Sequence, residues 1–227
     1  MKRLLFFFTA AVIFALNLRA DEPVVFNTEW IPSQPEMLTY RSKSNLGEGL
    51  YQVTLLKRDS LVEVYINIIS PGFTKTVSGT MTLDMHPLQS TSKIFVDKQI
   101  LMNTTCLYES SRVCVATDML PYKKRTSDTL EFTKQVFDFS QAPLLARTLH
   151  LEEGGRYAFI SLNPRTNKLV PLTIQVIGKE RLRKIECFKV EMNDFESKSV
   201  YWIEKDSRHR VLKIEQPESH GITELLE

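Results

Sequence analysis

The 227-residue sequence is poor in glycine, in cysteine and in sequence motifs of catalysis, and each shortage excludes a class of protein. With 8 glycines and no internal repeat or low-complexity block, the chain is neither a repeat array nor a fibrous protein. Its 3 cysteines include no Cys-x-x-Cys pair, and its 4 histidines lie far apart, so we predict no metal site and no cofactor. The Gly-x-Ser-x-Gly elbow of serine hydrolases is also missing. We therefore predict no catalytic residues and expect the protein not to be an enzyme.

A long apolar run occurs only at the start of the chain. Two basic residues precede an apolar stretch from Leu4 to Leu16, and Ala20 offers a small residue for cleavage, which is the pattern of a signal peptide. The stretch is too short to span a bilayer comfortably, and no second one follows. We expect residues 1–20 to be removed on export, leaving a periplasmic or secreted chain without a membrane span. Because Asp21 and not a cysteine follows the cleavage point, we expect no lipid anchor.

Removal of the signal peptide also removes the apparent excess of positive charge. The count of Lys and Arg falls from 29 to 26 while 27 Asp and Glu remain, so the net charge becomes about −1. A nucleic-acid-binding protein needs a basic surplus to neutralise phosphates, and we predict no nucleic-acid partner. The basic cluster of Lys123, Lys124 and Arg125 is interpreted as a solvated turn.

Strand patterns dominate the rest of the sequence. Residues 51–57 and 61–69 predict a hairpin, and the alternation from Phe73 to Leu83 predicts a long, half-buried strand. Strands recur at intervals of roughly ten residues with turn residues between them, which indicates an antiparallel meander and not βαβ units. We expect one β-rich domain over residues 46–227, after an irregular lead-in over residues 21–45.

One segment has the spacing of a helix. Ser140 is a candidate N-cap, Pro143 lies in the first turn, and apolar residues recur at helical spacing up to Leu149. A single short apolar helix in a strand-rich chain is expected to cover the concave face of a curved sheet. The predicted fold class is therefore mainly β: a large curved antiparallel sheet with one short helix on its concave face.

The cysteines leave two interpretations open. Cys106 and Cys114 flank a polar turn, and two antiparallel strands there predict a disulfide between them, with two free thiols as the alternative. Cys187 lies in the apolar run from Ile185 to Val190 and is interpreted as a buried, inert thiol.

Several short stretches in the C-terminal part of the chain carry a family resemblance. They are Phe137 to Ser140, Pro143 to Leu149, Val170 to Leu172, Cys187 to Val190, Lys198, Tyr201 to Ile203, and Arg210 to Lys213. In these stretches, residues 137–216 resemble a family of exported bacterial proteins, domain-of-unknown-function family 3108. The resemblance implies a relative of the lipoprotein-carrier fold, in which a large antiparallel sheet curls into an unclosed barrel around helical material. It implies no catalytic residues.

An unclosed barrel has an apolar concave face that a helix, a lipid or a partner must cover. The leading hypothesis is a non-enzymatic periplasmic protein that binds a hydrophobic or lipid-like ligand, or an envelope protein, on this face. The alternative is a structural or interaction module with a packed interior and no ligand cavity.

Two residues are candidates for contact with a ligand. Arg147 lies on the otherwise apolar helix, where it either anchors an anionic headgroup, extends to solvent or pairs with a buried acid. Trp202 lies either at the rim of a ligand cleft or in the core.

Overall fold

The structure is a computed structural model, and it describes residues 24–45, 47–138, 141–164, 166–194, 197–206 and 208–226. The predicted signal peptide, residues 1–20, and the predicted N-cap Ser140 lie outside the described residues.

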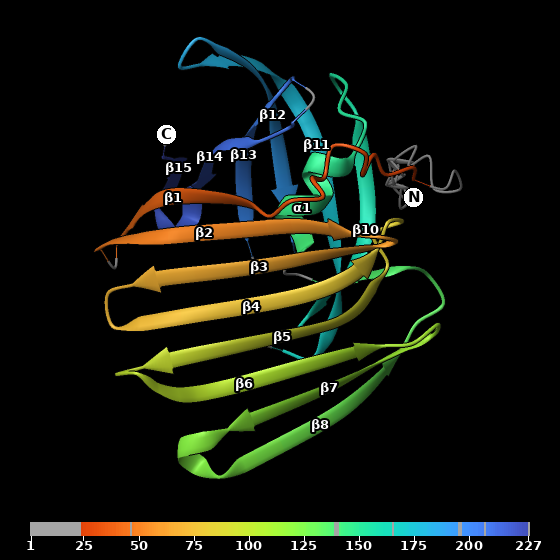
Figure 1. Ribbon diagram of the computed structural model, residues 1–227, viewed down its shortest axis with the longest axis vertical. Helices are drawn as coiled ribbons and strands as arrows, with labels where there is room; N and C mark the ends of the chain where they lie inside the picture. The colour runs from red at the N-terminus through yellow and green to blue at the C-terminus, as the bar shows by residue number, and fades with distance from the viewer. Residues whose placement is uncertain are drawn as a thin grey trace, which may run out of the picture.

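One sheet contains every strand of the described residues, and its order is β8-β7-β6-β5-β4-β3-β2-β1-β15-β14-β13-β12-β11-β10-β9 (Figure 1). The strands are β1 (Glu36–Ser44), β2 (Gly47–Arg58), β3 (Leu61–Ser70), β4 (Phe73–Thr82), β5 (Pro87–Val96), β6 (Gln99–Tyr108), β7 (Arg112–Met119), β8 (Lys124–Glu131), β9 (Val136–Asp138), β10 (Arg156–Asn163), β11 (Lys168–Leu182), β12 (Ile185–Asn193), β13 (Lys198–Glu204), β14 (Val211–Gln216) and β15 (Gly221–Leu225). Only the short β9 runs parallel to its neighbour, β10. The first and last strands therefore lie side by side in the middle of the sheet, with one meander on each side.

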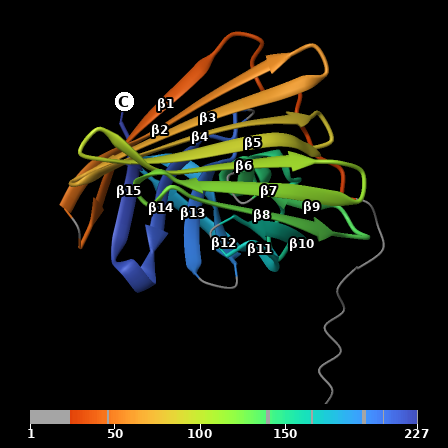
Figure 2. The same ribbon diagram turned by 90° about the horizontal axis from the view of Figure 1, so that it is seen from below.

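The sheet curls until its two halves face each other, with β1 to β8 on one side and β9 to β15 on the other (Figure 2). The edge strands β8 and β9 are not paired with each other. Side chains join the two ends instead: Val113 and Cys106 pack in one cluster with Val136 and Leu162. The prediction of a large, curved, unclosed antiparallel sheet is therefore confirmed.

The helix α1 (Ala142–Thr148) lies inside the curl. Leu144, Leu145, Ala146 and Leu149 are each at most 3% exposed, so the apolar residues of this segment are buried inside the curl. A helix of seven residues is not stable in water by itself, so this packing stabilises α1. Among the described residues, no helix is long and apolar enough to cross a membrane.

The irregular lead-in is shorter than predicted. The sequence predicts irregular structure over residues 21–45, whereas Glu36–Ser44 forms β1 and pairs with both β2 and β15. Its inward residues Leu38 and Tyr40 belong to the core. Regular extended structure becomes possible directly after Pro35, because a strand interior cannot accept a proline without losing a ladder hydrogen bond.

Candidate functional site

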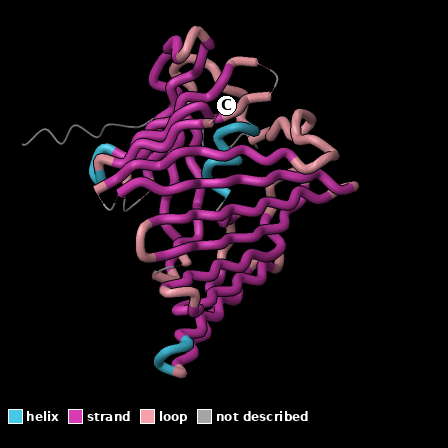
Figure 3. Tube along the Cα trace, turned by 60° about the vertical axis from the view of Figure 1, so that its left-hand side comes forward, coloured by secondary structure: helices cyan, strands magenta, loops and turns pink. Residues whose placement is uncertain are grey.

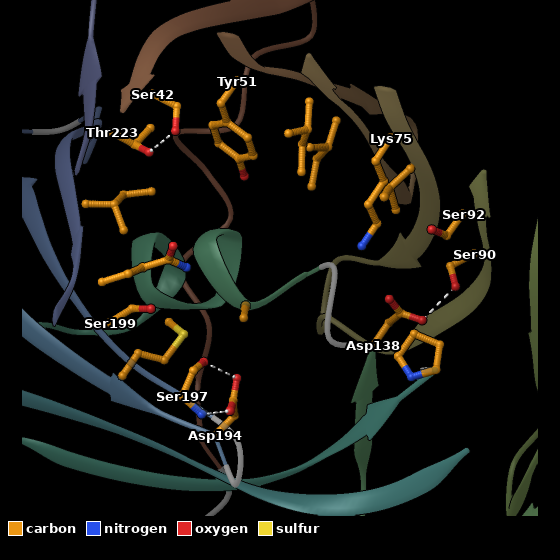
Figure 4. Close-up of a pocket in the computed structure, with 18 of the residues that line it drawn as sticks. Ser42, Tyr51, Lys75, Ser90, Ser92, Asp138, Asp194, Ser197, Ser199 and Thr223 are labelled. Carbon is orange, nitrogen blue, oxygen red and sulfur yellow. Dashed lines mark hydrogen bonds between the residues drawn. The ribbon is translucent and has the colours of Figure 1, made fainter. Parts of the chain in front are cut away.

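The concave interior holds a cavity of about 290 Å³ beside α1 (Figure 4). Both halves of the sheet line it, through β1 to β6 on one side and β12 to β15 on the other. Its volume lies at the lower end of the range for small-molecule sites, about 300–1,000 Å³. The interior is therefore not fully packed beside α1.

One part of the cavity wall is aliphatic. Ile66 and Val77 from the N-terminal half face Met192 and Ile214 from the C-terminal half, and Ala142 of α1 contributes to the same lining. These side chains occupy inward positions of their strands, where alternate residues point to the same face. Such a surface favours a ligand with an apolar part.

Another part of the wall presents hydrogen-bond donors. Figure 4 shows Lys75 and Tyr51 pointing into the cavity from β4 and β2. Within the described residues, neither Lys75 Nζ nor the Tyr51 hydroxyl forms a hydrogen bond or an ion pair. Burial lowers the pKa of Lys75 from its usual value, and the negative charge of Asp138 opposes this shift in part. Burial raises the pKa of Tyr51, so its phenol stays a neutral donor. The site thus holds two donors that a ligand's oxygen atoms would satisfy.

The buried carboxylate of Asp138 forms part of the cavity wall and also holds the curl together. Its Oδ2 accepts hydrogen bonds from Ser90 Oγ and from the Tyr108 hydroxyl, both at 2.6 Å, and its backbone N–H donates to Gln141 Oε1 at 2.8 Å. Asp138 ends β9, whereas Ser90 and Tyr108 lie on β5 and β6. Because hydrogen bonds to a charged group are the stronger kind, this cluster fixes the free edge β9 against the opposite half of the sheet.

A second carboxylate, Asp194, lies at the far side of the cavity from Lys75 (Figure 4). It accepts hydrogen bonds from the backbone N–H of Ser197 at 2.6 Å and from Ser197 Oγ at 3.1 Å. The acidic groups of the cavity therefore accept hydrogen bonds from donors of the protein, whereas Lys75 Nζ donates no hydrogen bond within the described residues.

Arg147 does not line this cavity; it fixes α1 to its surroundings. It donates from Nε to the carbonyl oxygen of His209 at 2.9 Å, and from Nη2 to the carbonyl of Arg208 at 3.0 Å and to Glu36 Oε2 at 3.2 Å. Its guanidinium also lies 4.1 Å from the centre of the Trp30 ring. Burial lowers the pKa of Arg147, and the charge of Glu36 opposes that shift. The sequence leaves three roles open for Arg147, and its contact with Glu36 agrees with one of them, pairing with an acid.

Trp202 also lies outside the cavity. Its neighbour Tyr201 lines the cavity, so Trp202 occupies the opposite face of β13. Lys189 and Lys213, its partners on the adjacent strands, place their ammonium groups 4.9 and 4.7 Å from its ring centre. The indole is 3% exposed because the lysine side chains cover it. The two residues that the sequence offers as ligand contacts are thus not brought together.

The predicted disulfide between Cys106 and Cys114 is wrong. All three cysteines are free, and the register pairs Cys106 with Val115 and Leu107 with Cys114. A shift of one residue places the two thiols on opposite faces of the sheet. Burial raises the pKa of Cys106 to about 12, with a further contribution from Asp138, so this thiol is protonated.

Cys187 is fully buried, as predicted, and burial raises its pKa as well. A thiol of raised pKa is a poor nucleophile. Within the described ranges, no group of three or more His, Cys, Asp and Glu side chains is arranged to hold a metal ion.

Sequence reasoning missed the cavity residues, although one signal was present. In the segment from Phe73 to Leu83, Lys75 shares the phase of Val77 and Met81, which predicts an inward charge in an apolar row. The other polar residues of the cavity come from strands far apart in the chain, and no local pattern connects them.

The fold and the cavity define a class of protein: an unclosed barrel of one antiparallel sheet that surrounds a short helix and a partly polar cavity. A family model described as "Protein of unknown function (DUF3108)" matches residues 72–226, and the chain belongs to this family. The match confirms the resemblance seen in residues 137–216 and extends it toward the N-terminus. No protein of curated function is significantly similar in sequence.

The chain resembles several solved structures, including the following two. A beta-barrel-like protein of domain of unknown function DUF1849 from Brucella abortus has a TM-score of 0.59 and 11% identity, over 87% of this chain and 98% of that one. A DUF1089 family protein from Pseudomonas aeruginosa has a TM-score of 0.40 and 12% identity, over 83% of this chain and 91% of that one. The first likeness shows a shared fold, and the second adds nothing to that argument.

Proposed function

We propose that the protein is an exported, non-enzymatic binding protein that holds a small amphipathic ligand in the cavity beside α1. The observation that carries this proposal is the cavity of about 290 Å³ with an aliphatic wall and the inward-facing Lys75 and Tyr51. An apolar chain fits against Ile66, Val77 and Ile214, where it would replace water at a favourable free energy. The polar end of the ligand would accept hydrogen bonds from Lys75.

The chemistry of Lys75 favours an acidic headgroup. The half-buried ammonium of Lys75 loses part of its hydration, and an anionic oxygen of a ligand would restore part of that loss. The charge of Asp138 also attracts Lys75, and its Oδ2 already accepts hydrogen bonds from two hydroxyl groups. Export rests on the pattern of residues 1–20, and a kinship with lipoprotein carriers remains a prediction of the family resemblance.

Calorimetric titration with dodecanoate, and with dodecanol as its uncharged counterpart, tests the proposal. We expect dodecanoate to bind, and dodecanol to bind about tenfold or more weakly because it lacks the charge-assisted contact with Lys75. Ser92→Phe, which fills the cavity from β5, should abolish binding. Thr91→Phe, the adjacent residue on the outer face of the same strand, is the matched control and should bind as the wild type does.

The protein purified from its own envelope gives an independent measurement. Native mass spectrometry should show an added amphiphile mass that is missing from Ser92→Phe. If the wild type carries no added mass and does not bind dodecanoate, the proposed function is wrong. N-terminal sequencing of the same protein should begin at Asp21 if residues 1–20 are cleaved on export.

A further inference from the structure

The tip of the β7–β8 hairpin has an unusual chemistry. Leu120, Pro121 and Tyr122 form a single 3-10 turn with no buried residue, and Leu120 and Tyr122 are 50% and 74% exposed. Among the large, exposed hydrophobic side chains of the described residues, only these two lie in a connection between strands. Four other hairpin tips of the described residues carry turn residues, namely Asp59-Ser60, Pro71-Gly72, Asp97-Lys98 and Arg183-Lys184.

Three exposed basic residues follow the apolar turn directly. Of these, Arg125 approaches a carboxylate, with 3.7 Å between its Nε and Asp118 Oδ1. Lys123 and Lys124 form no ion pair within the described residues. All three side chains are exposed, which agrees with the interpretation of this cluster as a solvated turn. The structure adds that the cations lie beside an exposed leucine and an exposed tyrosine.

The tip is well placed to reach a flat surface. It lies at the end of the molecule remote from α1, next to the edge strand β8, and projects as an extremity (Figures 1 and 3). The backbone N–H of Lys123 donates to the carbonyl of Leu120 at 3.2 Å, and Met119 pairs with Lys124, so the turn presents its side chains from a hydrogen-bonded hairpin.

We propose that this tip docks the protein on a membrane leaflet that carries anionic lipid headgroups. Tyrosine prefers the interface between headgroups and acyl chains, and leucine gains free energy from insertion below it. Each lysine near an anionic surface strengthens binding about fivefold. One weak anchor alone gives only marginal binding to a membrane. The apolar turn and the lysines together provide two anchors.

Co-sedimentation of the mature chain with vesicles tests this proposal. Vesicles of equal parts phosphatidylglycerol and phosphatidylcholine should retain the protein, and pure phosphatidylcholine vesicles should retain much less. The double variant Lys123→Gln, Lys124→Gln should lower the partition coefficient about 25-fold, and Leu120→Ser, Tyr122→Ser should lower it at least as far. Raising the salt concentration should reduce binding of the wild type.

A charge-matched control separates the tip from the rest of the surface. Lys134→Gln, Lys168→Gln removes two exposed lysines elsewhere and should leave binding to anionic vesicles unchanged. Circular dichroism should give the same spectrum for all variants, because every altered side chain is exposed. Failure of the wild type to bind anionic vesicles, as expected if the tip contacts a protein instead, overturns the proposal. Equal binding by the wild type and both tip variants also overturns it.

Discussion

The two ends of the concave interior are built on the same strands but from different side chains. Along β3, the inward residues Val62 and Val64 near α1 are 0% and 2% exposed. Further along the same row, Ile66 is 7% exposed and Ile68 is half-buried beside the cavity. The α1 end is therefore a dry core, and the other end is a wall of the cavity.

The chemistry changes in the same direction on other strands. On β13, the inward-facing side chains are Ile203 at the α1 end, Tyr201 in between and Ser199 at the cavity. The row of β1 changes similarly, from Leu38 to Ser42. Seven helical residues are about 10 Å long, whereas a ten-residue strand is about 33 Å long. A helix of this size fills one end of the interior, and rows that carry hydroxyl groups line the cavity at the other end.

The largest expected difference between the two ends is in packing energy. Leu145→Ala should lower the free energy of unfolding by about 3–4 kcal/mol, because Leu145 is fully buried on α1 and its removal leaves a void. Ile68→Ala at the cavity end should cost only about 1 kcal/mol, because the side chain already borders open space. Urea unfolding followed by circular dichroism measures both, and equal losses would contradict the comparison.

Arg147 tests whether the α1 end is purely structural. Arg147→Met should lower the free energy of unfolding by about 2–3 kcal/mol, because it leaves Glu36 and two backbone carbonyls without their donor. Dodecanoate affinity should stay as in the wild type, since Arg147 does not line the cavity. Unchanged stability with loss of dodecanoate binding would instead assign Arg147 to the headgroup.

The smallest change in the free energy of unfolding, and the only expected increase, is that of a substitution at Lys75. Lys75→Met should raise the free energy of unfolding at pH 7 by about 1 kcal/mol, because it removes a charge that is desolvated in the folded state. Burial lowers the pKa of Lys75 below its unfolded value of 10.5, so the folded state releases the proton first. The wild type should therefore gain stability relative to the variant as the pH rises toward 10.5.

Urea unfolding at pH 7 and pH 10 measures this difference. A difference that does not change with pH would show that the ammonium carries no desolvation cost in the folded protein.

Much of the fold was predictable because the sheet is built from local hairpins. The pattern of residues 61–69 predicts β3, observed at Leu61–Ser70, and the alternation from Phe73 predicts β4. The error at Cys106 and Cys114 shows the limit of such patterns, since a register change of one residue inverts the face of every side chain.

The cavity was less predictable because its walls meet only in the folded chain. Asp138 contacts Ser90 across 48 residues, and Met192 faces Val77 from the other half of the sheet. Arg147 attracted notice as the lone charge on an apolar helix, yet its partner Glu36 lies 111 residues away. Only Lys75 carried a local sign, a charge in an inward-facing row.

The neighbouring positions of β1 and β15 impose an order on the formation of the sheet. Thr223 Oγ1 of β15 donates to Ser42 Oγ of β1, a contact between residues 181 positions apart. During synthesis each meander can pair locally, but β1 keeps an unpaired edge until β15 has emerged, and such edges promote association with other chains. A chain truncated before Gly221 would leave β1 and β14 as two open edges in place of one continuous sheet. The final strand thus determines when β1 loses its open edge.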